Sequence, residues 1–185
     1  MRRYEALRAL LAALDPEDLA VFSTGLIGRE AFHAGDRPTS FYMMGSMGLA
    51  SSLGLGLALS TDRRVVVVEG DGSALMDLGS LAMVAAERPR RFTHVVLDNA
   101  SYESTGGQPA ASAVADLAAV ARAAGYARVA AVDDAGSLAR EMAAARREPG
   151  PHFLRVRVAA GRRDGVPRVG VSPPDLVRRL RGVLA

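Results

Sequence analysis

The 185-residue sequence contains no cysteine, no tryptophan and no lysine, so all 23 of its basic residues are arginine. Without cysteine, the chain has no disulfide bond, thiolate zinc site or cysteine nucleophile. Without lysine, it has neither a Walker A phosphate loop nor Schiff-base chemistry. Because it also has only three histidines, few of its own side chains are suited to chemical catalysis.

Charge and hydropathy point to neither a nucleic-acid nor a membrane partner. The formal net charge is +3, and the arginine pairs are scattered, without the clusters and interleaved aromatic residues of a nucleic-acid-binding surface. No apolar run approaches the roughly 18 residues that a membrane-spanning helix needs. The N-terminal segment predicts an amphipathic helix rather than a signal peptide, with an apolar side made of Tyr4, Leu7, Leu10, Leu11 and Leu14. We therefore expect a cytoplasmic protein.

Short apolar strands alternate with longer helical stretches, and the length suits one domain over residues 1–185. The expected strands are Ala20–Ser23, Val65–Glu69, Thr93–Asp98, Arg128–Val132 and Phe153–Val158. The expected helices are Ala50–Leu59, Ala74–Glu87, Val114–Ala124, Ser137–Arg147 and Pro174–Leu184. Strands that are apolar throughout are typical of a sheet covered on both faces. The pattern predicts an α/β fold, a doubly wound, mostly parallel sheet with helices on both faces and a ligand crevice at the carboxyl ends of the strands.

One connection breaks this alternation. Asn99–Ser112 is a long stretch of small and polar residues. Most connections in α/β proteins are shorter, so a connection of this length favours a functional loop.

Two polar motifs follow neighbouring strands of the expected sheet. Gly70-Asp71-Gly72-Ser73 comes directly after the expected strand Val65–Glu69. Asn99, 28 residues beyond Asp71, comes directly after the next expected strand, Thr93–Asp98. A right-handed crossover brings both ends to the same edge of the sheet. Free amides at a helix start, with carboxylate and amide oxygens, suit a phosphate and a divalent cation. Taken singly, a Gly-Asp-Gly turn and an asparagine cap are common; together, in this order and at this spacing, they favour a magnesium–diphosphate site.

At this point the sequence resembles a known family. Gly70-Asp71-Gly72, then 25 residues, then Asp98-Asn99 is similar to the cofactor motif of thiamine diphosphate-dependent enzymes, although Asp98 stands where the family has asparagine. Further segments, Arg37–Ser52, Ser104–Gln108 and Ser23-Thr24-Gly25, resemble the branch that decarboxylates sulfopyruvate or phosphonopyruvate. The resemblance runs from about Ala20 to about Leu180 and implies the cofactor-binding (PP-type) domain of such an enzyme.

The resemblance also implies roles for particular residues. Asp71, Asn99 and the backbone carbonyl of Ser101 would bind Mg²⁺, and Met47 would wedge between the two rings of thiamine diphosphate. The residues expected to contact the cofactor are Thr24, Gly25, Gly45, Ser46, Met47, Gly48, Gly70, Asp71, Gly72, Ser73, Asn99, Ser101, Tyr102, Ser104 and Thr105. Without the family, Met47 would be assigned to the core and Ser-Thr-Gly-Gly to a flexible loop.

One element of this chemistry has no counterpart in the sequence. Enzymes of this family activate the cofactor with a glutamate on a second, pyrimidine-binding domain, and no glutamate here has that context. Because the chain opens with its own helix, we expect a complete β subunit that works with an α subunit carrying the glutamate, for example as an α2β2 hetero-oligomer. The cofactor would then lie at the interface.

The function expected from the resemblance is decarboxylation of a small 2-oxo acid with an anionic group on C3, sulfopyruvate or phosphonopyruvate, to the aldehyde and CO2. Two alternatives stay open. The same cofactor could serve a carboligase, in which the carbanion attacks an acceptor aldehyde or ketone. The chain could also be a non-catalytic magnesium–diphosphate-binding module.

The remaining polar candidates are assigned mainly structural roles. His94 lies within an expected strand and His152 at the start of another, and Glu69 lies at a strand end beside the metal motif. His33, Arg29 and Arg37 could face an anionic substrate, but exposed surface positions are the favoured interpretation.

Overall fold

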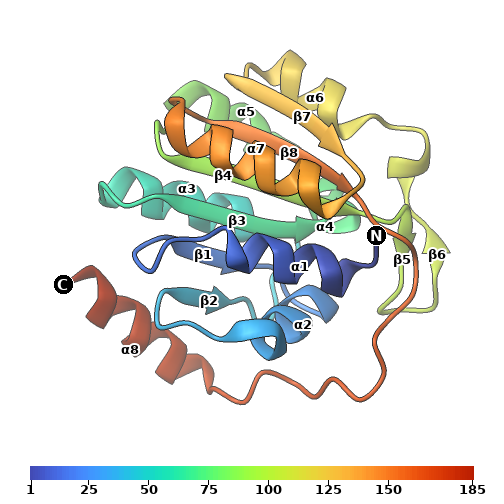
Figure 1. The fold of residues 1–185 in the computed structure, drawn as a ribbon, viewed down its shortest axis with the longest axis horizontal. Helices are drawn as coiled ribbons and strands as arrows, with labels where there is room; N and C mark the ends of the chain where they lie inside the picture. The colour runs from blue at the N-terminus through green and yellow to red at the C-terminus, as the bar shows by residue number, and fades with distance from the viewer.

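The computed structural model describes residues 1–185 and contains a six-stranded parallel sheet with strand order β2-β1-β3-β4-β8-β7 (Figure 1). The strands of this sheet are β1 (Leu19–Phe22), β2 (Ser40–Tyr42), β3 (Val65–Gly70), β4 (Phe92–Asp98), β7 (Arg128–Val132) and β8 (His152–Arg157). A separate antiparallel pair consists of β5 (Ser101–Tyr102) and β6 (Gln108–Pro109). The helices are α1 (Arg3–Ala12), α2 (Leu26–Gly35), α3 (Ala50–Ser60), α4 (Asp71–Met76), α5 (Gly79–Glu87), α6 (Leu117–Ala124), α7 (Ala135–Arg147) and α8 (Pro173–Leu184), with a 3₁₀ turn at Ala111–Ala113.

Helices cover both faces of the sheet, which confirms the predicted doubly wound α/β fold. On one face Val66 and Val95 pack in a core with residues of α1, α2 and α7. On the other face Val67 and Val96 pack with residues of α3, α5 and α6. All four valines are fully buried, because alternate side chains of a strand point to opposite faces and each face here has its own helical layer. Helix α8 lies beside β2, at the edge of the sheet.

The predicted elements are found with some changes of boundary. The expected helix Ala74–Glu87 is two helices, α4 and α5, with a break at Asp77-Leu78, and α4 begins at Asp71, before Ser73. The expected helix Val114–Ala124 begins at Leu117, where Asp116 accepts hydrogen bonds from the Ala118 and Ala119 amides as N-cap.

Four short elements were not predicted as such: the strands β2, β5 and β6 and the 3₁₀ turn. Strand β2 has only three residues, too few for a visible hydropathy pattern, and it pairs with β1 at the sheet edge. The long Asn99–Ser112 connection contains the β5–β6 pair and the 3₁₀ turn.

The pairing of β3 with β4 decides where the polar motifs lie. Gly70 is in register with Leu97, so Asp71 and Asn99 leave the sheet at the same edge, one from each neighbouring strand. This confirms the predicted adjacency. The segment after β1 opens on the same edge, because β1 pairs with β3 in parallel on its other side.

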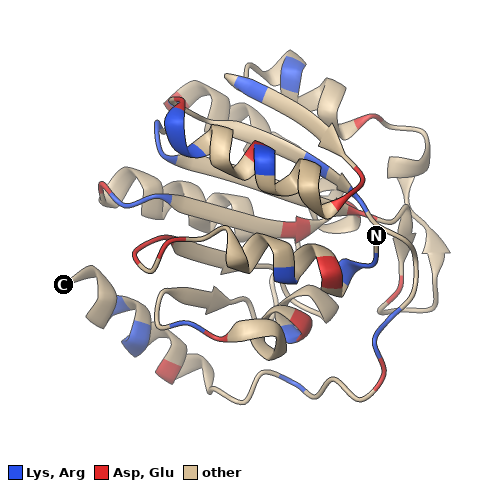
Figure 2. Ribbon diagram, in the orientation of Figure 1, with Lys and Arg blue, Asp and Glu red and all other residues tan.

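Acidic and basic residues are interspersed over the ribbon (Figure 2). Several form ion pairs between elements, as Arg146 at the end of α7 does with Asp18 before β1, at 2.8 Å. No helix in the structure combines the length and the apolar character needed to cross a membrane.

Helix α3 packs closely on the sheet through Gly54. A Cβ at this position would lie 2.2 Å from Cγ2 of Val67, whereas a Cβ on Gly56, an exposed glycine of the same helix, would meet nothing within 4 Å. We predict that Gly54→Ala lowers the free energy of unfolding by about 1–3 kcal/mol through overpacking. Gly56→Ala should raise it by up to about 1 kcal/mol, because alanine favours helix. Urea unfolding of both variants is the measurement, and shifts of the same sign would contradict this packing.

Candidate functional site

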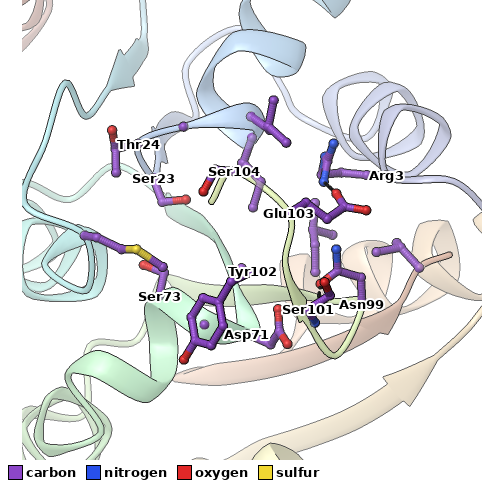
Figure 3. Close-up of a pocket in the computed structure, with 18 residues that line it drawn as sticks. Arg3, Ser23, Thr24, Asp71, Ser73, Asn99, Ser101, Tyr102, Glu103 and Ser104 are labelled. Carbon is purple, nitrogen blue, oxygen red and sulfur yellow. Dashed lines mark hydrogen bonds and ion pairs between the residues drawn. The ribbon is translucent and has the colours of Figure 1, made fainter. Parts of the chain in front are cut away.

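A cleft lies at the carboxyl edge of the sheet, where the segments after β1, β3 and β4 meet (Figure 3). Its volume is about 100 Å³. Eleven of the residues predicted to contact a cofactor line this cleft: Thr24, Gly25, Met47, Gly70, Asp71, Gly72, Ser73, Asn99, Ser101, Tyr102 and Ser104. Segments that are distant in the sequence therefore form one site, because parallel strands end at a common edge.

Asp71 is the first residue of α4 and only 3% exposed, although it borders the cleft. Its carboxylate accepts a hydrogen bond from Ser112 Oγ. Burial raises the pKa of the Asp71 carboxyl; the Ser112 hydrogen bond opposes this increase and the negative charge of Asp98 adds to it. A nearby cation would stabilise this buried carboxylate, because an opposite charge favours the ionised form of a carboxyl group. Its environment therefore fits a metal ligand.

Asn99 begins the long connection, at the end of β4. Its Oδ1 accepts a hydrogen bond from the Ser101 amide at 3.0 Å, which closes a turn at the start of the connection. A carbonyl oxygen has two lone pairs, so one remains for another ligand. No group of three His, Asp or Glu side chains that could hold a metal is present. The available donors are thus one carboxylate with amide and carbonyl oxygens, the hard oxygen ligands that Mg²⁺ takes together with a phosphate.

Asp98, the residue that departs from the family motif, has its hydrogen-bond partners outside this donor set. It is buried, and Oδ2 accepts a hydrogen bond from Arg155 Nε on β8 at 2.6 Å. Its Oδ1 accepts from the Ala100 amide at 3.0 Å. The negative charge of Asp98, where the family has asparagine, is therefore paired with Arg155 on the adjacent strand. Asn99 remains at the edge of the sheet.

Tyr102 covers the Gly70-Asp71-Gly72 motif. A Cβ on Gly72 would lie 2.3 Å from Cε1 of Tyr102, so the ring packs directly against the glycine backbone. Figure 3 shows the ring beside Asp71 at the cleft. Glycine at position 72 is thus required by the close approach of this side chain.

Sequence reasoning missed an ion-pair cluster at one end of the cleft. Arg3, 5% exposed, donates hydrogen bonds to Glu30 on α2 at 3.1 and 2.7 Å and also to Glu103 in the connection. Burial alone would lower the pKa of Arg3, but the hydrogen bonds that Arg3 donates to both glutamates, together with their negative charges, raise it overall. Glu103 also accepts a hydrogen bond from the Gly161 amide. No sequence signal could pair these residues, since they lie 27 to 100 positions apart and only the fold brings them together.

Four of the predicted cofactor residues do not line the cleft: Gly45, Ser46, Gly48 and Thr105. The first three belong to the loop before α3, of which only Met47 reaches the cleft. Thr105 is exposed, and its hydroxyl lies 2.9 Å from Oε1 of Gln108.

An exposed apolar rim lies beside the cleft. It consists of Met44, Met47, Leu49, Met76 and Leu78, each at least 37% exposed. The two segments that supply it are adjacent, since Ser52 Oγ donates to Asp77 Oδ2 at 3.2 Å. Single exposed apolar residues are ordinary, but several gathered at one place mark an interaction surface.

We predict that Gly72→Ala displaces Tyr102 and loosens the connection, because the added methyl group would overlap the ring. Chymotrypsin cleaves after exposed tyrosine, so cleavage after Tyr102 should accelerate while the fold persists. Gly79→Ala is the matched control: it also lies near α4, and its Cβ would meet only Asp77 Oδ1 at 3.7 Å. Equal cleavage rates in both variants would contradict the close packing of Tyr102 on Gly72.

Comparison with known proteins assigns the site to a class. Residues 25–156 match the family model described as "Thiamine pyrophosphate enzyme, C-terminal TPP binding domain". The chain therefore belongs to the thiamine pyrophosphate (thiamine diphosphate) enzymes, as its motifs predicted.

Two relatives and one solved structure show what the chain and its fold are similar to. The chain is 47% identical to a phosphonopyruvate decarboxylase of Streptomyces viridochromogenes over 97% of its own length, and spans 45% of that relative. It is 42% identical to a sulfopyruvate decarboxylase subunit beta of Methanothermobacter thermautotrophicus, covering 97% of this chain and 93% of that protein. The fold matches benzoylformate decarboxylase of Polynucleobacter necessarius with a TM-score of 0.77 at 20% identity, over 88% of this chain and 34% of that one.

Proposed function

We propose that residues 1–185 form one cofactor-binding domain, the β subunit of a two-subunit decarboxylase dependent on thiamine diphosphate and Mg²⁺. Its substrate would be sulfopyruvate or phosphonopyruvate, and its products the aldehyde and CO2. The observation that carries the proposal is the convergence of Asp71, Asn99 and Met47 on one cleft, in a chain whose relatives are named for these two reactions.

Each residue of the cleft has a defined task in this proposal. Asp71, the free lone pair of Asn99 and the Ser101 carbonyl would hold Mg²⁺. The segment Thr24-Gly25 and Ser104, which all line the cleft, would bind the diphosphate, while Met47 would support the bent shape of the cofactor. When bound, thiamine diphosphate supplies the nucleophilic carbon and the electron sink for the decarboxylation. The chain itself binds, orients and excludes water.

The glutamates near the cleft support the need for a partner subunit. Glu103 lines the cleft but is paired with Arg3, and Glu30 is paired with the same arginine. Glu69 is fully buried and hydrogen-bonded to His94 and Ser73. Since all three glutamates already have ion-pair or hydrogen-bond partners within this chain, the activating glutamate would come from a pyrimidine-binding α subunit.

The dimensions of the cleft support the same arrangement. At about 100 Å³ it is smaller than the roughly 300–1,000 Å³ of typical small-molecule sites. A second surface seated on the apolar rim would close it around a ligand of cofactor size. The lengths of the relatives agree, because one is twice as long as this chain and the other is a separate subunit of about the same length.

The direct test is reconstitution. The chain is mixed with its candidate α subunit, thiamine diphosphate and Mg²⁺, and aldehyde release is followed from sulfopyruvate, phosphonopyruvate and pyruvate. We expect turnover of one anionic substrate only when both subunits are present. Turnover by the chain alone, or carboligation with an added acceptor aldehyde as the main reaction, would contradict the proposal.

We predict that Asp71→Ala weakens Mg²⁺-dependent binding of thiamine diphosphate by roughly 100-fold or more, the scale expected for removing one partner of a buried charge pair. Calorimetric titration of the cofactor with and without Mg²⁺ measures this. Asp62→Ala, in the turn before β3 at the opposite edge of the sheet, is the control and should bind as the wild type does. Unchanged binding in Asp71→Ala would contradict the metal assignment.

A further inference from the structure

A continuous line of hydrogen bonds runs beneath the cleft, from the core to the loop before α3. The Tyr126 hydroxyl lies 3.1 Å from His94 Nδ1, and His94 Nε2 lies 2.7 Å from Glu69 Oε1. Ser73 Oγ donates to Glu69 Oε2 at 2.6 Å and accepts from the Gly48 amide at 3.0 Å. Glu69 and His94 are fully buried, and Ser73 and Tyr126 are nearly so.

The direction of each hydrogen bond in this line follows from the Gly48 amide at one end, where donor and acceptor are unambiguous. The Gly48 amide can only donate, so the Ser73 oxygen accepts, and the single hydroxyl proton of Ser73 goes to the Glu69 carboxylate. The other carboxylate oxygen accepts from His94, whose second nitrogen then accepts from Tyr126. Every polar group in the line thus has a partner, as a buried network requires. The Ser73 side chain is fully used, so its hydroxyl proton is not free for a diphosphate.

The last bond in the line holds an otherwise free loop. Met43 is anchored to β1 by its amide, and Leu49 leads into α3. Between them, residues 44–48 make one hydrogen bond to another part of the protein, from Gly48 to Ser73. Ser46 in this loop has a φ of 54°, a conformation that costs a non-glycine residue about 1–3 kcal/mol. A strained, exposed loop keeps its shape only where the surroundings constrain it.

A buried carboxylate needs a reason here, because an apolar residue of similar size is often as stable or more so. Glu69 has two oxygens in one plane, and they join a histidine on β4 to a serine on α4. The ring of Phe153 packs edge to face against both His94 and Tyr126, which restricts the imidazole. The Glu69 carboxylate is therefore held in place by His94 on one side, and on the other side it binds Ser73, which holds the loop.

We propose that Glu69, supported by His94 and Tyr126, is a positioning residue that orients Ser73 and through it fixes Gly48 and the neighbouring Met47. The inference rests on the proposed function only in naming thiamine diphosphate as the ligand that Met47 meets. Neither Glu69 nor His94 would touch the cofactor; they would set the shape of the loop before it binds.

The test compares three variants with a control. Glu69→Leu removes both acceptors, Ser73→Ala removes the bond to Gly48, and Glu69→Gln keeps an acceptor for Ser73 and gives His94 a donor in its other tautomer. Ser51→Ala is the matched control, because it removes a buried 2.8 Å hydrogen bond to Ser80 next to the same loop without contacting Gly48. The first readout is hydrogen–deuterium exchange of peptides covering residues 44–49 in the full chain without cofactor.

We expect exchange in these peptides to rise about tenfold in Glu69→Leu and Ser73→Ala, the scale of one lost hydrogen bond. Glu69→Gln and Ser51→Ala should stay within about twofold of the wild type. Thiamine diphosphate affinity, measured with Mg²⁺, should fall in the same two variants and recover in Glu69→Gln. Should Glu69→Leu fail to fold, Ser73→Ala carries the test alone.

The outcomes separate this inference from the proposed function. Unchanged exchange at residues 44–49 in Ser73→Ala overturns the positioning role, whatever the chain binds. Faster exchange throughout the protein, equal in Ser51→Ala, also overturns it, because the line would then be only structural. Local loosening in a chain that does not bind thiamine diphosphate even together with its α subunit supports the positioning role and refutes the function.

Discussion

The parallel pairing of β3 with β4 is the constraint on which the site depends. It places the ends of two buried valine-rich strands side by side, so that Asp71 and Asn99 meet although 28 residues separate them. Burial of both faces makes this pairing stable, since a shift of one residue would turn the valines of each face toward the wrong helical layer. The chemistry at the edge is therefore held by the hydrophobic core below it.

Three contacts then shape the edge into a cleft. Tyr102 packs on Gly72, Glu103 pairs with Arg3, and Ser73 holds Gly48. Each ties a loop to an element of the sheet or a helix packed on it. Loops held in this way reduce the ordering cost of binding, which is how preorganisation raises affinity. The apolar rim stays exposed beside these contacts.

The alternation of apolar strands and helices predicted the fold class, the motif spacing predicted the shared edge, and the resemblance of the motifs predicted the family. Gly-Asp-Gly after one strand and Asn99 after the next indicate local chemistry, and the apolar runs indicate a sheet covered on both faces. The resemblance placed Ser73 among the residues that contact the cofactor, and the structure adds that its hydroxyl proton is donated to Glu69. Glu69 and His94 were expected to be separate structural residues, although they lie 2.7 Å apart in one network. The short strand β2 and the break at Asp77-Leu78 left no readable pattern.

The sequence has no lysine or cysteine and only three histidines, so it offers few side chains suited to chemical catalysis, and its periodicity indicated the order of strands and helices. Only the tertiary structure decided which groups are free. Side chains about 100 residues apart, such as Arg3 and Glu103, become partners through packing, and such pairing leaves no trace in local sequence. Hydropathy reports the average environment of a segment, whereas hydrogen-bond capacity is assigned atom by atom once the fold exists.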